Sequence, residues 1–328
     1  MRIAMIGAGA MGAMFGARFA GSGADVVLYD IDKAHVDAIA QSGLRFETPK
    51  AISIVKLRAT SDADSIGEAD AAVILVDSNA TKAAAAIAER ILKPNGFVLT
   101  LQNGIGNVET LVGVLGPRRI LAGTTYNSAA KLAPGRVLHS NIGETTIGEI
   151  DGSRSERIGQ LAGLFKASGL PIEVSDNVVG HVWMKFILNA AINPVCAVTG
   201  LRPGEIARTA PARQLLEALL AEILVVINAK GVTLPILDPR SLVLDHAWER
   251  YNRPSMLQHV EQGRRTEIDS LNGALLNEAR RLGIACPVNE TIVLIVKSIE
   301  ARNVALANTP QLDEAALEAV ARAEKRRN

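Results

Sequence analysis

Short apolar runs alternate with segments of helical periodicity through the first half of the chain. The runs are bounded by glycine or polar residues, as is typical of buried strands, and they lie at 2–6, 25–29, 71–76 and 97–101. The segments with helical spacing lie between them, at 10–20, 32–41 and 78–92. Strands that alternate with helices in this way predict an α/β protein with a doubly wound, largely parallel sheet.

Further strand-like segments predict the margins of this sheet. They are 44–46, 52–57, 120–129, 136–139, 145–150 and 171–174. The first two alternate between apolar and polar residues and predict an edge hairpin. The turn at Pro134-Gly135 predicts that the sheet finishes in hairpins, with a helix at 157–168 before the last strand.

Beyond Asp176 no strand pattern recurs. Helical segments are predicted by length and apolar spacing at 178–198, 214–230, 238–250, 264–282, 290–303 and 314–326. The segment 214–230 is apolar nearly all round, which favours a buried helix or a subunit contact. We therefore expect an all-α C-terminal domain, with a homodimer through it as a further expectation.

Composition narrows the class of protein. With 48% hydrophobic residues, 21% charged residues and a net charge of +1, the chain fits a globular protein with no nucleic-acid-binding surface. Its two cysteines make no disulfide framework, which favours a reducing, cytoplasmic compartment. The stretch Met1–Ala20 is interrupted by glycines and continues into a strand, so we do not expect a secretory signal. We also expect no membrane span and no metal site.

The first strand runs directly into Gly7-Ala8-Gly9-Ala10-Met11-Gly12, the G-x-G-x-x-G spacing of a dinucleotide-binding turn. Gly7 allows the tight turn, Gly9 lets the backbone approach a pyrophosphate, and Gly12 lets the helix lie close to the sheet. Asp30 follows the second strand, where a carboxylate binds the ribose hydroxyls. This context predicts that residues 1–176 form a Rossmann-type domain that binds a dinucleotide.

A polar stripe interrupts the first helix of the C-terminal half. Lys185, Asn189 and Asn193 recur at every fourth position and fall within an arc of about 80° on an otherwise apolar helix. Such groups are costly to bury unless they are paired or face a ligand. The alternatives are an exposed helix face or a lysine paired with a structural carboxylate. Pro194 removes one N–H group and so frees the carbonyl of Ala190.

Two more polar clusters accompany the stripe. Gln102-Asn103-Gly104 follows a predicted strand, at the edge where a doubly wound sheet binds its ligands. The second cluster is Asn252-Arg253-Pro254-Ser255-Met256 with Gly263-Arg264-Arg265-Thr266-Glu267-Ile268-Asp269. Either piece of the second cluster alone is equally compatible with a helix-breaking turn and solvated charges. Together with the stripe, they predict a substrate-binding and catalytic domain over residues 177–328.

In the order and spacing of these motifs the chain resembles the ketopantoate reductase (2-dehydropantoate 2-reductase) family over nearly its whole length. The resemblance rests on the glycine turn, on Gln102-Asn103-Gly104, on Trp183-x-Lys185-x-x-x-Asn189-x-x-x-Asn193, and on Ser255-Met256 ahead of the Thr266–Asp269 segment. It implies an NAD(P)-dependent reductase of a 2-oxo acid, either 2-dehydropantoate or a related branched or aromatic acid. It also implies that Lys185 is the proton donor and Glu267 its carboxylate partner. The polar groups that it assigns to substrate and nicotinamide are Asn103, Asn189, Asn193, Asn252 and Ser255.

The chain departs from the family pattern at the cofactor site. Relatives that use NADPH usually place basic residues where this sequence has Asp30 and Asp77, so we expect NAD(H) to be favoured over NADP(H). His259 stands where an aspartate is common in the family motif. Two other functions stay open: a 3-hydroxyacid dehydrogenase of the 6-phosphogluconate type, and a nucleotide-binding sensor without turnover.

Overall fold

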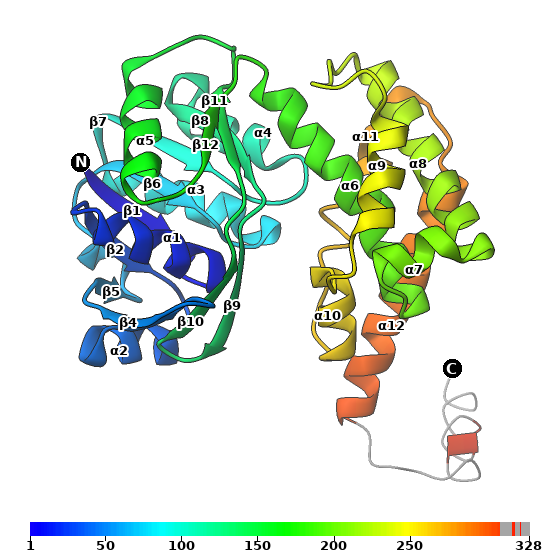
Figure 1. The fold of residues 1–328 in the computed structure, drawn as a ribbon, viewed down its shortest axis with the longest axis horizontal. Coiled ribbons are helices and arrows are strands. Elements are labelled where there is room, and N and C mark those ends of the chain that lie inside the picture. Colours follow the sequence, from blue (N-terminus) through cyan, green and yellow to red (C-terminus); the bar gives the residue numbers. More distant parts are fainter. Residues whose placement is uncertain (309–316, 319–321, 323–328) are drawn as a thin grey trace.

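A computed structural model describes residues 1–308, 317, 318 and 322. The described residues form an α/β part followed by a bundle of helices, and helix α6 (Val178–Thr199) crosses from the first part into the second (Figure 1). This arrangement confirms the predicted fold class. The helix predicted at 314–326 lies largely outside the described residues, of which 317, 318 and 322 are helical.

The main sheet of the α/β part has the strand order β12-β11-β8-β7-β6-β1-β2-β5 among the described residues. Every neighbouring pair is parallel except β8 and β11. Its strands are β1 (Arg2–Ile6), β2 (Asp25–Tyr29), β5 (Arg58–Thr60), β6 (Ala69–Ile74), β7 (Leu92–Thr100), β8 (Ile120–Thr125), β11 (Thr145–Glu149) and β12 (Ile172–Val174). The sequence pattern did not predict β5, which pairs with β2 at the edge of the sheet.

Helices cover both faces of this sheet, and the side chains of β1 alternate between them. Ile3 and Met5 pack in one core with residues of α1 and α5, whereas Ala4 and Ile6 pack in another with residues of α3 and α4. The helices of the α/β part are α1 (Ala10–Gly21), α2 (Lys33–Ser42), α3 (Thr81–Ile91), α4 (Asn107–Leu115) and α5 (Glu156–Ala167). Helix α4 was not predicted.

A second sheet of four strands lies beside the main one, in the order β4-β3-β10-β9. Its strands are β3 (Leu44–Glu47), β4 (Ile52–Val55), β9 (Ser128–Ala133) and β10 (Arg136–Asn141). The prediction that β9 and β10 finish the main sheet was therefore wrong, because β10 pairs in parallel with β3 instead. The predicted strand 120–129 is broken after Thr125, where the side chain of Asn127 bonds to Thr125 and Gly143 and turns the chain.

The helical part packs around α6. Its other helices are α7 (Pro203–Arg208), α8 (Ala210–Lys230), α9 (Pro239–Glu249), α10 (Ser255–Glu261), α11 (Asn272–Leu282) and α12 (Pro287–Asn308). The predicted helix 264–282 begins only at Asn272. The preceding segment is held as a turn because Glu300 accepts a hydrogen bond from the backbone N–H of Thr266, and the Thr266 hydroxyl accepts one from that of Ile268.

Helix α6 is long and apolar enough to cross a membrane by length and composition, but 72% of its most apolar window is buried inside the protein. Helix α6 is buried because it packs against α8, α10 and α12 and so forms the centre of the helical part. Cys196 of α6 and Cys286 before α12 are both buried and unpaired. The buried core of the helical part includes residues from nearly every helix around α6.

Candidate active site

The glycine turn between β1 and α1 is shaped by close backbone contacts. Gly7 has a φ of +94°, and its N–H donates to the carbonyl of Tyr29 at 2.9 Å. A side chain at Gly12 would place its Cβ 1.9 Å from the carbonyl oxygen of Gly7, so no larger residue fits. Gly9, by contrast, has no atom within 4 Å of a Cβ added to it. The turn therefore exposes backbone at Gly9, directly before the N-terminus of α1 with its unpaired N–H groups.

Carboxylates surround the end of β2. The Asp30 carboxylate accepts a hydrogen bond from the backbone N–H of Asp32 at 2.9 Å, while Asp32 caps α2 by accepting from the N–H of His35. Lys131 of β9 reaches across and pairs with Asp32 at 2.7 Å. This ion pair lowers the pKa of Asp32. Among the described residues Lys131 is thus the only cation that forms an ion pair with these carboxylates, and its partner is Asp32, not Asp30.

Gln102-Asn103-Gly104 follows β7, and each of its residues has a different environment. The Gln102 amide donates to the carbonyl of Val76 at 2.8 Å and to the hydroxyl of Thr81 at 2.9 Å, so it ties neighbouring strand ends together. The backbone carbonyl of Asn103 accepts from Asn107 at 2.9 Å. The side-chain amide of Asn103 makes no hydrogen bond with any described residue. Of the three, the Asn103 side chain is thus the one that is free to bind a ligand.

Gly104 brings the two parts of the molecule together. A Cβ at Gly104 would lie 2.6 Å from the carbonyl oxygen of Ser270, in the turn before α11. The close approach therefore seats the Asn103-Gly104 turn of the α/β part against the turn that carries Glu267. Two predicted clusters that are far apart in the sequence meet here.

Lys185 points from α6 toward the end of β8. Its ammonium donates to the backbone carbonyl of Thr125 at 2.5 Å and lies 5.7 Å from the centre of the Tyr126 ring. Burial lowers the pKa of Lys185 to about 8, and the charge of Glu267 opposes that shift. A lysine with such a pKa can hold or release a proton near neutral pH.

Asn189 and Asn193 follow Lys185 along α6. Asn193 is only 8% exposed, and neither amide side chain has a hydrogen-bond partner among the residues that the structure describes. The carbonyl of Ala190, which Pro194 frees, accepts a hydrogen bond from the side chain of Asn272 at 2.9 Å. The polar stripe is therefore not an exposed helix face, and of its three side chains only that of Lys185 has a hydrogen-bond partner among the described residues.

Ser255, the first residue of α10, approaches Glu267, which lies in the segment between α10 and α11. The Ser255 hydroxyl donates to the Glu267 carboxylate at 3.3 Å, and both side chains are half-buried. Asn252 is exposed and makes no hydrogen bond within the described part of the chain. The structure thus brings Lys185, Glu267 and Ser255 into one region, whereas no contact joins Asn252 to them among the described residues. His259 lies close enough for Glu267 and Asp77 to act on its pKa, which burial lowers.

Three residues of this site were missed by sequence reasoning. Thr125 and Tyr126, which contact Lys185, were hidden because the strand was predicted to run on to residue 129. A break in that strand, signalled by Tyr126-Asn127, would have placed both at a strand end. Lys131 carries no local signal, since its pairing with Asp32 depends on the second sheet.

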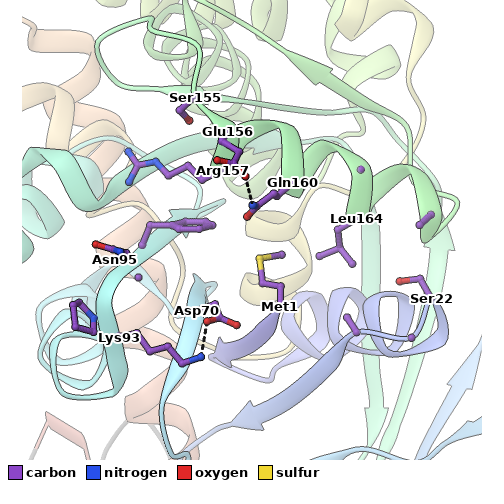
Figure 2. Close-up of a pocket in the computed structure, with 17 residues that line it drawn as sticks. Met1, Ser22, Asp70, Lys93, Asn95, Ser155, Glu156, Arg157, Gln160 and Leu164 are labelled. Carbon is purple, nitrogen blue, oxygen red and sulfur yellow. Dashed lines mark hydrogen bonds and ion pairs between the residues drawn. The ribbon is translucent and has the colours of Figure 1, made fainter.

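A wide groove on the described surface lies elsewhere. A groove of about 1250 Å³ opens at the amino ends of the parallel strands, between the start of β7 and helix α5. Figure 2 shows the Lys93–Asp70 ion pair on one side of it and Glu156, Arg157 and Gln160 on the other. None of the predicted site residues lines this groove. A cavity of about 70 Å³ does border the site, beside Gln102, Gly104 and Trp183.

Comparison with known proteins identifies the same relationship over both parts. The family model described as ketopantoate reductase PanE/ApbA matches residues 3–152, and the model of its C-terminal part matches residues 177–300. A 2-dehydropantoate 2-reductase of Halobacterium salinarum is 32% identical over 298 residues, which cover 90% of this chain and 98% of that protein. One from Archaeoglobus fulgidus is 31% identical over 300 residues, covering 91% of this chain and 98% of the relative.

Solved structures agree in fold along almost the whole chain. A PanE/ApbA family ketopantoate reductase of Ralstonia eutropha JMP134 superposes with a TM-score of 0.85 and 34% identity, covering 92% of this chain and 99% of the other. The ternary structure of a D-mandelate dehydrogenase with NADH and anilino(oxo)acetate superposes with a TM-score of 0.84 and 25% identity, with the same coverage. Since the matched motifs, the sequence identity and the fold all agree, the chain belongs to the ketopantoate reductase family.

Proposed function

We propose that this chain catalyses the reduction of a 2-oxo acid to the 2-hydroxy acid, with hydride from a nicotinamide cofactor and a proton from Lys185. The observation that carries the proposal is a half-buried lysine that shares one face of α6 with Asn189 and Asn193, whose amides have no partner among the described residues. The Asn103 side chain, which likewise has none, lies on the turn that packs against the turn of Glu267. Asn193 is 8% exposed and the other two amides are half-buried, so their free donors and acceptors are available to a polar ligand next to Lys185.

The proton step follows from the chemistry of the lysine. Hydride delivered to the 2-carbon of an oxo acid leaves negative charge on the former carbonyl oxygen, and the Lys185 ammonium can neutralise it by general-acid catalysis. Thr125 holds that ammonium by its carbonyl before substrate arrives. The charge of Glu267 favours the protonated form of Lys185, which is the form that can donate a proton.

Neutral groups suit the rest of the substrate. A 2-oxo acid brings a carboxylate and a side group, which amides and a hydroxyl can bind without cancelling the charge of Lys185. We assign these contacts to Asn103, Asn189, Asn193 and Ser255, with Asn252 at the margin of the site. The named relatives act on 2-dehydropantoate or are D-mandelate dehydrogenases, so a branched and an aromatic 2-oxo acid are both candidate substrates.

Residues 1–176 are proposed to bind the cofactor and residues 177–328 to complete the substrate site. The turn Gly7-Ala8-Gly9-Ala10-Met11-Gly12 fits a pyrophosphate, because Gly9 exposes backbone and α1 starts beside it. The cofactor supplies the hydride when it is bound. On the side of the chain, Asn103 is suited to bind the nicotinamide end from the turn after β7.

Within that site we propose a preference for NADH over NADPH. Asp30 follows β2, where a 2′-phosphate would bring about two negative charges against it. The basic residues nearby are matched to other groups: Lys131 pairs with Asp32, and Arg45 pairs with Glu47 at 2.8 Å. Lys33, at the start of α2, is exposed and is the remaining candidate to meet a phosphate.

We further propose a homodimer through the helical part. Val225 of α8 is 53% exposed, and Leu294 and Ile295 of α12 are 67% and 42% exposed. Large apolar side chains on two helices that contact each other suit a subunit interface. Light scattering on the eluting protein measures the mass directly, and a monomer at micromolar concentration would contradict this assignment.

The deciding test of the activity is a panel of substrates, in which turnover is measured by the change in absorbance of the nicotinamide cofactor. The panel contains 2-dehydropantoate, an aromatic 2-oxo acid and a short unbranched 2-oxo acid, each with NADH and NADPH, and a set of 3-hydroxy acids, each with NAD+ and NADP+. We expect turnover with at least one branched or aromatic 2-oxo acid. Turnover confined to 3-hydroxy acids would favour a dehydrogenase of the 6-phosphogluconate type, and cofactor binding without turnover would favour a sensor.

A further inference from the structure

A buried polar cluster lies beneath the end of β8, behind the carbonyl that holds Lys185. Its members are Thr125, Asn127, His139 and Thr145, which are 3%, 7%, 1% and 0% exposed. They come from β8, from the bend after it, from β10 and from β11. Four buried polar side chains in one place are stable only if they satisfy one another, so their hydrogen bonds fix the local backbone.

Asn127 is the centre of this cluster. Its amide nitrogen donates to the hydroxyl of Thr125 and to the carbonyl of Gly143, both at 2.8 Å, and lies 3.2 Å from the hydroxyl of Thr145. Its amide oxygen accepts from His139 at 3.0 Å and from the N–H of Gly143 at 3.3 Å. The hydroxyls of Thr125 and Thr145 are themselves 2.8 Å apart. One side chain thus ties together the end of β8, the start of β11 and the strand β10.

Arg18 fixes the protonation of the histidine in this cluster. Its guanidinium donates to Nδ1 of His139 at 3.3 Å, so Nδ1 is an acceptor and Nε2 carries the hydrogen that is donated to Asn127. Burial and the charge of Arg18 lower the pKa of His139 to about 4. His139 is therefore neutral at physiological pH and orients the Asn127 amide in one direction.

The cluster ends at Lys185. Asn127 binds the hydroxyl of Thr125, and the backbone carbonyl of the same Thr125 accepts the hydrogen bond from the Lys185 ammonium. We infer that Asn127 is a positioning residue for Lys185: it fixes the Thr125 carbonyl, and that carbonyl holds the ammonium in place for proton donation. This inference rests on the proposed function, in which Lys185 is the proton donor.

The expected consequence concerns the charged form of the lysine. A carbonyl held in place stabilises the ammonium and opposes the effect of burial, so loosening it should lower the pKa of Lys185 further. The titratable groups that face Lys185 are Glu267, from the turn before α11, and Tyr126, from the bend after β8. On the other side of the cluster, Arg18 and His139 face Asn127. Glu267 and Tyr126 therefore interact with Lys185 directly, whereas Arg18 and His139 can affect it only by way of Asn127.

The test compares Asn127→Ala and Thr145→Val with Thr146→Val. Thr145 and Thr146 are neighbours on β11, and both are buried, but the Thr146 hydroxyl bonds to Glu173 and not to the cluster. For each variant, kcat and kcat/KM for 2-oxo acid reduction are measured from pH 6 to pH 10, together with KM for the cofactor. We expect Asn127→Ala to lower kcat by roughly three- to tenfold. We also expect the alkaline limb of its pH profile, the fall in kcat/KM at high pH, to move to lower pH by about 0.5–1 pH unit. Thr145→Val should move it in the same direction by less, and Thr146→Val should leave it in place.

Two results would overturn the inference. One is an alkaline limb in Asn127→Ala that coincides with that of the wild type; if that variant does not fold, the same result in Thr145→Val decides. The other is a loss of kcat matched by an equal rise in KM for the cofactor, which would indicate general loosening of the fold. Lys185→Ala separates this failure from failure of the proposed function. If its alkaline limb persists, Lys185 is not the acid, and if the limb disappears, the role of Asn127 alone is in question.

Discussion

The side chain of Asn272 on α11 donates a hydrogen bond to the carbonyl of Ala190 on α6, the carbonyl that Pro194 leaves without its helical partner. Proline at the fourth position after Ala190 has no N–H to offer, so the interior of α6 would otherwise contain an unsatisfied oxygen. Asn272 is fully buried and is held in turn by Asn289 at 2.9 Å. The helix that carries Lys185 is thus completed by a residue from another helix.

Loss of this contact should destabilise the protein. We expect Asn272→Ala to lower the free energy of unfolding by about 1–3 kcal/mol, because it leaves the Ala190 carbonyl buried and unpaired. Chemical denaturation measures the change. Asn277→Ala is the matched control, since Asn277 lies on the same helix but is exposed and should cost little. Equal stability of the two variants would show that α6 tolerates the free carbonyl.

Removal of the proposed proton donor should act on the chemical step. We expect Lys185→Ala to lower kcat by about 10²-fold or more, with a much smaller change in cofactor binding, because the ammonium acts on charge that develops in the transition state. Steady-state kinetics together with a cofactor titration measures both. Lys166→Ala, which removes an exposed lysine of α5, controls for the change in net charge. A Lys185→Ala enzyme with near wild-type kcat would remove Lys185 from the mechanism.

The pKa of Lys185 near 8 predicts opposite pH profiles for the two directions of the reaction. Reduction needs the ammonium, so kcat/KM for the oxo acid should fall as the pH rises through about 8. Oxidation of the hydroxy acid needs the neutral amine and should rise over the same range. Profiles measured in both directions from pH 6 to pH 10 check this, and profiles that move together would assign the titration to another group.

Glu267 should affect both binding and turnover. Its negative charge favours the Lys185 ammonium, and its carboxylate accepts the hydrogen bond of Ser255. We therefore expect Glu267→Gln to raise KM for the oxo acid, to lower kcat, and to move the alkaline limb of reduction to lower pH. Asp269→Asn is a control from the same turn, because Asp269 pairs with Lys297 away from the site. If Glu267→Gln matched this control in all three measurements, Glu267 would be a solvated residue of the turn.

Asp30 should decide between the two cofactors. We expect the wild-type protein to have a higher kcat/KM with NADH than with NADPH, and Asp30→Ala to shift the ratio toward NADPH by about fivefold, since one like charge is removed from the phosphate. Asp37→Ala, at an exposed position of α2, is the control. A wild-type preference for NADPH would contradict the prediction and direct attention to Lys33.

The main sheet could be predicted because its signals are local. The apolar runs that became β1, β2, β6 and β7 are short and bounded by glycine or polar residues, and the glycine turn fixes the junction of β1 with α1. In the second sheet, the predicted hairpin of residues 44–46 and 52–57 is confirmed as the antiparallel pair β3 and β4. Its pairing with β10 could not be predicted, because nothing in residues 44–47 shows that their other partner is a strand about ninety residues later. The three-residue strand β5 was also not predicted, because its pairing with β2 defines it. The segment before α11 was wrongly predicted as helix, because a hydrogen bond to Glu300 holds it as a turn.

The site shows the same division between local and distant information. Lys185, Asn189 and Asn193 were found because the period of a helix places them on one face. The groups that hold the lysine in place were not found, because Thr125 contributes a backbone carbonyl, which has no signature in the residue type. Lys131 was missed for a related reason, since its partner Asp32 is distant in the sequence.

The parallel pairing of β3 with β10 also constrains the order in which the chain folds. Between these two strands the chain must complete β5, β6, β7 and β8, so their contact closes a long loop and comes at a high entropic cost. Until β10 arrives, the hairpin of β3 and β4 has an open edge that can pair with another chain. The hairpin that brings His139 to Arg18 and Lys131 to Asp32 is therefore a late-folding element, and a refolding protein is most exposed to aggregation just before it docks.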